Sequence, residues 1–166
     1  MNYAQIRKFD VTNGPNVRCS LFVSGCTNKC PGCFNSELSD FNYGKLWTKE
    51  TEDLFISYAK DDNIFGVNFL GGDPMDQVNE VSLLNLLKRI NLEVKKPIWL
   101  CSGYTYEEII NNEKKLELLK EVDVLIDGRF ILEKRDLMLK YRGSSNQRVI
   151  DVKKSLRENT IIQIEI

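Results

Sequence analysis

The chain has 166 residues, with 23 Lys and Arg against 24 Asp and Glu, and this near-neutral balance argues against a strongly electrostatic binder of nucleic acid or membrane. It has five cysteines and no histidine, which excludes Ser-His-Asp and Cys-His pairs and leaves no imidazole as a metal ligand. Its start, "MNYAQIRKFD", has no apolar signal region, and no stretch approaches the roughly 20 apolar residues of a membrane span, so we expect a cytoplasmic protein.

Hydrophobic patterning predicts strands that alternate with helices. Thr48 is placed to cap the first helix, and Thr105 and Glu108 form a capping-box pattern for a later one. In chain order we expect a strand at 17–25, a helix at 48–60, a strand at 64–70, a helix at about 76–91, a strand at 97–101, a helix from 105, a strand at 122–127, short helices near 133–140 and 152–157, and a final strand, "TIIQIEI".

This alternation predicts an α/β protein with a mainly parallel sheet, in one domain that spans residues 1–166. Parallel sheets place their sites at the C-terminal ends of the strands. The segments that follow the four predicted strands are the cysteine-rich "CTNKCPGC", then "GGDP", "CSGYT" and "DGRF". We therefore expect these four segments to converge on one edge of the sheet.

The first of these segments holds Cys26, Cys30 and Cys33, a spacing that brings three thiolates round one centre, with Pro31 and Gly32 making the last turn. A structural zinc site wants four protein ligands and a catalytic site keeps an open position, so three cysteines favour a 4Fe-4S cluster with one iron left to another ligand. The cysteine spacing alone does not exclude two alternatives, which are a structural zinc knot and thiols that bind no metal. Alternation along the strand predicts that Cys19 is a core residue, and Cys101 receives no metal role.

The remaining motifs each have an ordinary structural interpretation that needs no bound ligand. The glycines of "GGDP" (Gly71, Gly72) suit a strand-to-helix turn or a close backbone approach to a ligand. "CSGYT" suits a helix start, and Asp127 and Arg129 in "DGRF" suit a surface ion pair. "RGSSNQ" (residues 142–147) suits an exposed, flexible loop.

Taken together, these motifs resemble a known family. "CTNKCPGC" is similar to the signature of the radical S-adenosylmethionine (radical SAM) enzymes, and "NGPNVRCSLFVSGC" resembles the segment leading to the cluster in those that activate glycyl-radical proteins. "RGSSNQ" resembles a segment typical of the activating enzymes whose partner is the anaerobic ribonucleotide reductase. The resemblance runs from about residue 2 to residue 147. It departs at Asn16, where relatives commonly have glycine.

This resemblance implies a partial β/α barrel of the radical SAM type. It also implies a 4Fe-4S cluster on the three cysteines, with S-adenosylmethionine on the open iron. The cofactor-binding residues it implies are Asn35, Gly71, Gly72, Asp73, Ser102, Asp127 and Arg129. Asp127 would lie near the ribose and Arg129 near the methionine carboxylate.

The implied reaction is reductive cleavage of S-adenosylmethionine to methionine and a 5′-deoxyadenosyl radical, which takes a hydrogen atom from a glycine of the reductase. The partners would be the catalytic subunit of the anaerobic ribonucleotide reductase and a small electron donor such as flavodoxin. Such chemistry needs no general base, in keeping with the absence of histidine. The alternatives are an activase of pyruvate formate-lyase type, a non-catalytic zinc-knot module and a small ferredoxin, which would want four cysteines per cluster.

Overall fold

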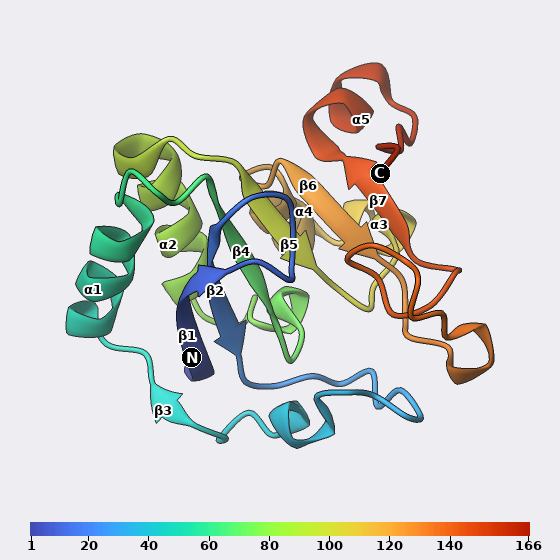
Figure 1. Cartoon of the computed structure of the whole chain (residues 1–166), viewed down its shortest axis with the longest axis horizontal. Coiled ribbons are helices and arrows are strands. Elements are labelled where there is room, and N and C mark those ends of the chain that lie inside the picture. Colours follow the sequence, from blue (N-terminus) through green and yellow to red (C-terminus); the bar gives the residue numbers. More distant parts are fainter.

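The computed structural model describes residues 1–166 and contains one seven-stranded sheet in the order β3-β1-β2-β4-β5-β6-β7 (Figure 1). Its centre consists of four parallel strands, which are β2 (Arg18–Val23), β4 (Gly66–Gly71), β5 (Ile98–Cys101) and β6 (Val124–Asp127). These are the four strands that the sequence predicted. Each is fully or almost fully buried, as expected of parallel strands covered on both faces.

The flanks of the sheet are antiparallel and were not predicted. β1 (Asn2–Asp10) pairs with β2, β3 (Lys45–Leu46) pairs with β1, and β7 (Arg148–Asp151) pairs with β6. β1 is mostly half-buried and mixes charged with apolar residues, so its sequence lacks the continuous apolar run that marks the central strands. The prediction of a mainly parallel sheet is therefore confirmed by its four central strands, to which the edges add antiparallel strands.

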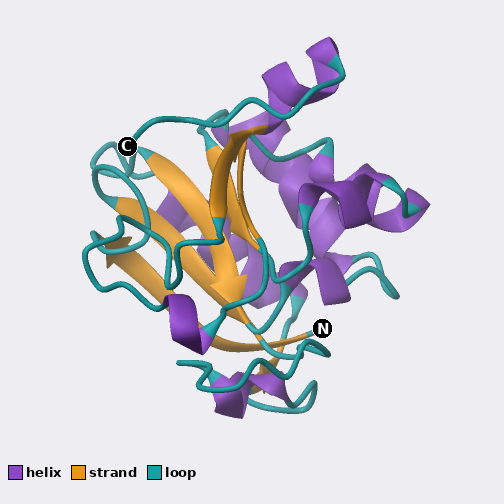
Figure 2. Cartoon of the chain, turned by 90° about the vertical axis from the view of Figure 1, so that its right-hand side faces the viewer, coloured by secondary structure: helices purple, strands orange, loops and turns teal.

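The helices gather on one face of the sheet (Figure 2), where they cover the main core. They are α1 (Lys49–Ala59), α2 (Ser82–Arg89), α3 (Tyr106–Ile110), α4 (Glu113–Leu119) and α5 (Val152–Glu158). On β2, Cys19, Leu21 and Val23 face this core, which confirms Cys19 as a packing residue. The alternate residues face the other side, where Phe22 packs with Leu70 and a second small cluster forms around Trp99.

Two predicted helix starts are confirmed by their caps. The hydroxyl of Thr48 accepts a hydrogen bond from the Thr51 N–H at 3.2 Å, and Thr105 and Glu108 form a reciprocal capping box. The helix expected at 76–91 begins only at Ser82, because the chain first makes a 3-10 turn at Pro74–Asp76. The last turn of this helix widens into a π-helical turn, Ile90–Val94.

The C-terminal quarter departs most from expectation. No helix forms at 133–140, where the structure has only a 3-10 turn, Leu132–Lys134. The helix near 152–157 is confirmed as α5. The final residues do not form a regular strand, but they run along β7, with the Asp151 N–H donating to Ile162 O and the Ile164 N–H donating to Val149 O.

A buried polar network supports the N-terminal half of the sheet. The Asp10 carboxylate accepts hydrogen bonds from Thr12, Asn13 and Ser20. Burial raises the pKa of Asp10, but these hydrogen bonds outweigh that effect and lower the pKa to about 2.

Asn16, where the sequence departs from its relatives, adopts the left-handed region with φ +63°, which asparagine tolerates better than most residues. The turn that glycine would make is thus preserved.

None of the helices has the length and apolar character needed to cross a membrane.

Candidate functional site

A cavity of about 420 Å³ lies at the C-terminal ends of the four parallel strands. The loops that follow these strands supply its walls, as expected for a parallel sheet. Eight of the ten predicted site residues line it, namely Cys26, Cys30, Cys33, Asn35, Gly71, Gly72, Asp73 and Ser102. The fold therefore brings together residues that are as far apart in the sequence as Cys26 and Ser102.

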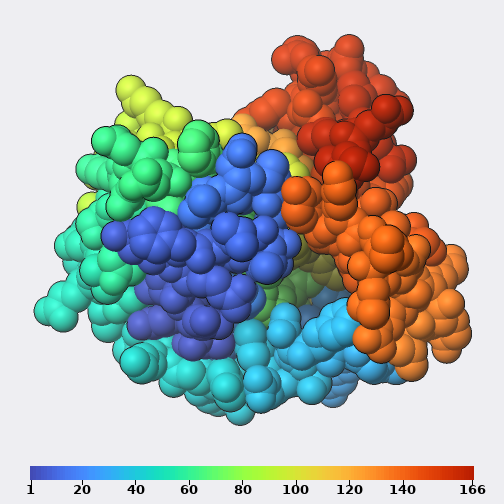
Figure 3. All heavy atoms as spheres, in the orientation of Figure 1, coloured from blue at the N-terminus to red at the C-terminus, as the bar shows by residue number.

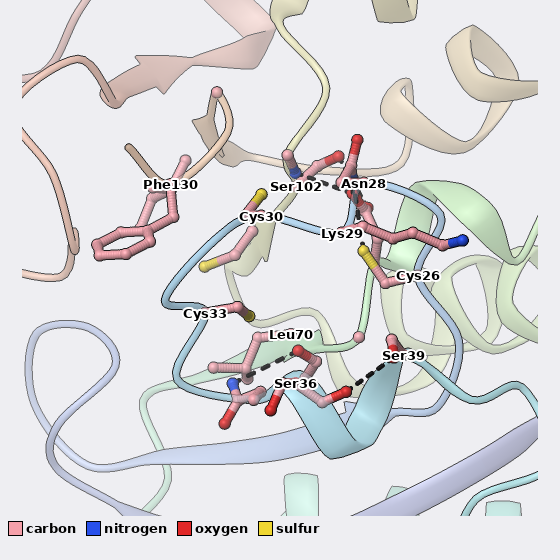
Figure 4. Close-up of a pocket in the computed structure, with 18 of the residues that line it drawn as sticks. Cys26, Asn28, Lys29, Cys30, Cys33, Ser36, Ser39, Leu70, Ser102 and Phe130 are labelled. Carbon is pink, nitrogen blue, oxygen red and sulfur yellow. Dashed lines mark hydrogen bonds between the residues drawn. The ribbon is translucent and has the colours of Figure 1, made fainter. Parts of the chain in front are cut away.

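The three cysteines lie on residues 26–34, here called the cysteine loop, which leaves the end of β2 (Figure 4). The Cys33 N–H donates to Cys30 O at 3.1 Å across Pro31 and Gly32, and Gly32 has φ +74°. Proline followed by a glycine at positive φ is the preferred pair for a type II turn, so the predicted turn is confirmed. This turn keeps Cys30 and Cys33 close together at the cavity wall.

Polar contacts hold the first half of the cysteine loop. The Asp76 carboxylate accepts the Thr27 N–H at 2.8 Å and the Tyr104 hydroxyl at 2.6 Å. The Asn28 side-chain amide donates to Asp73 at 2.7 Å and lies 3.5 Å from the Cys26 sulfur. Burial raises the pKa of the Cys26 thiol, so a metal that binds there must displace its proton.

Asp73 is the central organiser of this side of the cavity. Its carboxylate accepts four hydrogen bonds, from the Met75 N–H, the Ser102 hydroxyl, the Gly103 N–H and the Asn28 amide, at 2.7–2.9 Å. Burial raises its pKa to about 6, even though these bonds favour the ionised form. Four internal donors occupy the carboxylate, so its evident task in this conformation is to join three segments of the chain.

The two glycines of "GGDP" are required by the packing of the backbone. A Cβ on Gly71, which has φ +108°, would lie 2.7 Å from Val23 O, and a Cβ on Gly72 would lie 2.5 Å from Gly25 O. Both contacts are shorter than real Cβ atoms make, and the opposing atoms are main-chain atoms that cannot swing aside. The glycines thus allow β4 to pass close to the end of β2, which leaves their main chain at the cavity wall.

The segment between β6 and β7, residues 128–147, closes the remaining wall, and we call it the β6–β7 lobe. Gly128, Phe130 and Gln147 line the cavity. The Gln147 amide donates to Gly128 O at 2.9 Å, and the Asn146 amide donates to Arg129 O at 2.8 Å. The expectation of a flexible, exposed "RGSSNQ" loop is therefore wrong, because its amide side chains tie it to the end of β6.

Aromatic packing joins this lobe to the cysteine loop. The rings of Phe34 and Phe130 lie 5.1 Å apart, and the Arg135 guanidinium lies 5.3 Å from the Phe34 ring. A Cβ on Gly143 would approach Phe130 to 3.0 Å and Phe34 to 3.3 Å, so this glycine leaves room for the ring pair. The second half of the cysteine loop is thus supported by residues about one hundred positions later in the chain.

Asp127 and Arg129 do not line the cavity. Asp127 is buried and accepts the Tyr106 N–H at 2.7 Å and the Arg148 guanidinium, which also pairs with Glu107. This double pairing raises the pKa of Arg148. Arg129 is half exposed and forms an ion pair with Glu108 at 3.0 Å. The interpretation of "DGRF" as a surface ion pair between Asp127 and Arg129 is therefore wrong, because each of the two pairs with another residue. Their neighbours Gly128 and Phe130 reach the cavity instead.

Several cavity residues were not singled out from the sequence, notably Asn28, Phe130, Gln147 and Cys101. All four lie inside sequence motifs already described, which are "CTNKCPGC", "DGRF", "RGSSNQ" and "CSGYT". Cys101 differs from the other three because it also ends a buried strand and therefore has the pattern of a core residue. Burial raises the pKa of its thiol to about 12, so it lies at the cavity as a protonated, weakly reactive group.

The donor set fits an iron–sulfur cluster. All five cysteines are free thiols, and three of them border one cavity whose volume far exceeds that of a single ion. Each cysteine of a cubane cluster binds a different iron, so its thiolates need not converge on one point as the ligands of a zinc ion do. Beyond these three thiols the cavity offers main-chain and hydroxyl groups, which suit a small polar ligand beside the cluster.

Comparison with known proteins agrees with this donor set. A family model described as a 4Fe-4S single cluster domain matches residues 12–150, which is most of the chain. The fold and the site therefore define an α/β protein of the 4Fe-4S single cluster class.

Individual relatives narrow this class. Anaerobic ribonucleoside-triphosphate reductase-activating proteins from Vibrio cholerae and Escherichia coli K12 are 44% and 41% identical, each over 89% of this chain and 96% of the relative. The protein of the same description from Enterobacteria phage T4 is 40% identical over 90% of this chain and 93% of its own length. The chain belongs to this family of activating proteins.

Proposed function

We propose that this chain activates an anaerobic ribonucleotide reductase by reductive cleavage of S-adenosylmethionine at a 4Fe-4S cluster. It would thus be a radical SAM oxidoreductase, with residues 1–166 acting as one domain and the parallel sheet as a partial barrel. The relatives' shared description supports the partner. The observation that carries the proposal is the set of three thiols at one cavity, with room beside them for a second group.

The cluster would be held by Cys26, Cys30 and Cys33, which leaves one iron without a protein ligand. Support for this assignment comes from the two attachments of the cysteine loop, through Asn28 and Asp73 at one end and Phe34 and Phe130 at the other. A loop fixed at both ends can hold three sulfurs for a cluster with little further ordering.

S-adenosylmethionine would lie against the open iron and the cavity wall. The main chain of Gly71 and Gly72 would receive its ammonium group, and Ser102 and Asn35 border the same space. The role of Asp73 is positioning, since its carboxylate joins Asn28, Ser102 and Gly103. Asp127 would act from outside the cavity by fixing the start of α3, and Arg129 would reach a ligand carboxylate only by leaving Glu108.

When bound and reduced, the cluster would supply one electron for cleavage of the sulfonium of S-adenosylmethionine to methionine and a 5′-deoxyadenosyl radical, and this radical would take a hydrogen atom from a glycine of the reductase. The protein's part is to orient the cofactor and to exclude water. Phe130, Leu70 and Ile126 give the cavity apolar walls for this purpose. A small one-electron donor such as flavodoxin would supply the reducing equivalent.

Metal and cofactor analysis tests this proposal. Protein reconstituted without oxygen should contain about four iron and four sulfide per chain. Alanine at Cys26, Cys30 or Cys33 should abolish the cluster, whereas alanine at Cys19 or Cys101 serves as the matched control and should leave it. Stoichiometric zinc without iron would overturn the cluster and favour the zinc-knot alternative.

The cofactor and partner need separate readouts. Adding S-adenosylmethionine should change the electron paramagnetic resonance spectrum of the reduced cluster, and turnover should release methionine and 5′-deoxyadenosine. A glycyl radical should then appear on the reductase. Cofactor cleavage without a glycyl radical on the reductase would reject this partner and retain the cluster chemistry.

A further inference from the structure

The β6–β7 lobe carries a pair of strongly exposed apolar side chains. Leu137 and Met138 are 78% and 89% exposed, the two largest values among the large apolar residues of the chain. They belong to residues 132–140, the part of the lobe farthest along the chain from both β6 and β7 and here called its tip; the lobe is the orange segment at the right of Figure 1. Solvent exposure of two adjacent large apolar residues is unfavourable for an isolated protein and marks a candidate contact surface.

The base of the lobe is fixed, so this tip is not a loose end. Asn146 and Gln147 bond to the main chain at the end of β6, and the buried Ser144 hydroxyl accepts the Ile131 N–H at 3.2 Å. The Tyr141 ring packs edge-on against Trp99 in the sheet, with centroids 5.6 Å apart. A surface presented on a fixed base loses little conformational entropy when a partner binds.

The lobe lies beside the opening of the cavity. Phe130 lines the cavity and packs against Phe34, which is 61% exposed, and Leu132 packs over Gly32 of the cysteine loop. In Figure 3 the orange atoms of the lobe border the blue atoms of the chain that follows β2, next to a hollow in the surface. A protein that binds this lobe would therefore lie beside the cavity, where the radical would form.

The charge of the lobe indicates what would sit there. Residues 128–147 contain five basic and two acidic side chains, a net of +3, whereas the chain as a whole carries −1 and the rest of it therefore −4. Of the five basic residues only Arg129 forms an ion pair, which leaves Lys134, Arg135, Lys140 and Arg142 without a carboxylate partner. A second copy of this lobe would be repelled, while an acidic surface with an apolar centre would be attracted.

We propose that the tip of the β6–β7 lobe, residues 132–140, is the docking surface for the protein that donates the glycine, through an apolar contact at Leu137 and Met138 ringed by acidic groups of that protein. This inference rests on the proposed function. It assigns partner binding to the tip and cavity closure to "RGSSNQ". The reductase is the favoured occupant because its glycine must reach the cavity, whereas an electron donor needs only to approach the cluster.

The experiment compares two double variants in the full-length, cluster-loaded protein. Leu137→Asp with Met138→Asp places charge on the tip. Val81→Asp with Leu92→Asp is the matched control, since these residues are 64% and 75% exposed and flank α2, with Val81 just before it and Leu92 in the π-helical turn after it. Affinity for the purified reductase is measured directly by titration. We expect the tip variant to bind at least about tenfold more weakly and the control to remain within about twofold of the unmodified protein.

Three further measurements separate the possible outcomes. Lys134→Glu with Lys140→Glu should weaken reductase binding and reduce its dependence on salt. Iron content and the slow cleavage of S-adenosylmethionine by dithionite, without reductase, should stay unchanged in the tip variant, while the glycyl-radical yield falls. Unchanged reductase affinity would overturn the inference. A loss of glycyl-radical yield in the tip variant that appears with flavodoxin as reductant but not with dithionite would also overturn the inference, because it would make the tip a binding site for the electron donor.

Failure of the proposed function would look different. If the unmodified protein cleaved no S-adenosylmethionine, the radical chemistry would be rejected, yet the titration would still show whether the tip binds the reductase.

Discussion

Replacing Asp73 with alanine tests whether this carboxylate organises the cavity from within. The substitution removes the acceptor of four hydrogen bonds. Two of the donors are main-chain N–H groups, of Met75 and Gly103, and an unsatisfied buried donor costs about 1–3 kcal/mol. The other two, Asn28 and Ser102, border the cavity, where water can partly replace the acceptor.

The expected loss of unfolding free energy is about 2–4 kcal/mol. This range allows for a partly offsetting gain in free energy, because the variant no longer buries a carboxylate charge. Burial of that carboxylate raises its pKa to about 6. Asp73→Asn should lose less, because its remaining oxygen still accepts two of the four bonds. Both variants should also retain less cluster, since Asn28 loses or weakens its link to the "GGDP" turn.

Urea unfolding of the metal-free protein at pH 7.5 measures the stability, and iron content after anaerobic gel filtration measures cluster retention. Asp62→Ala is the control, because Asp62 is exposed and its side chain has no hydrogen bond. If Asp73→Ala matched this control within about 0.5 kcal/mol and kept its iron, the assignment of Asp73 as an internal organiser would be wrong.

Three further predictions concern other parts of the structure. Gly72→Val should destabilise the protein by at least about 3 kcal/mol and block cofactor binding, because even a Cβ there would lie 2.5 Å from Gly25 O; calorimetry and cofactor titration check this. Gly143→Val should separate Phe34 from Phe130 and lower cluster retention several-fold, with Gly143→Ala as a milder variant, measured by iron content. Asp10 has a pKa lowered to about 2, so its stabilisation is complete above the unfolded pKa near 4 and is lost as the pH falls towards 2; Asp10→Asn should therefore flatten the acid-unfolding curve between these values.

The central strands and their polar ends were predictable because each strand is a short apolar run followed by glycine or polar residues. The position of Cys26, Gly72 and Ser102 at one edge then follows from parallel topology alone. β1 and β7 were not predictable in the same way, since edge strands are half exposed and lack a distinctive pattern.

The finer details of the site depended on contacts between distant segments. The four donors of Asp73 come from three places in the chain, so no local pattern could show that its carboxylate is fully bonded. The family resemblance placed Asp127 and Arg129 at the cofactor, but Asp127 is bonded to Tyr106 and Arg148 and Arg129 pairs with Glu108, while their neighbours Gly128 and Phe130 line the cavity. "RGSSNQ" looked like a loop by composition, and only its amide bonds to the end of β6 reveal it as a wall.

The strand order has a consequence for how the chain assembles during synthesis. From β1 to β7 each strand joins the sheet beside one already made, with only β3 added on the outer side of β1. A chain emerging from the ribosome can thus extend its sheet step by step. The cysteines leave the ribosome early, yet Phe130 and Gln147, which complete the cavity around them, come about one hundred residues later. The three thiols therefore stay exposed for most of translation, and the complete cavity forms only once almost the whole polypeptide has been made.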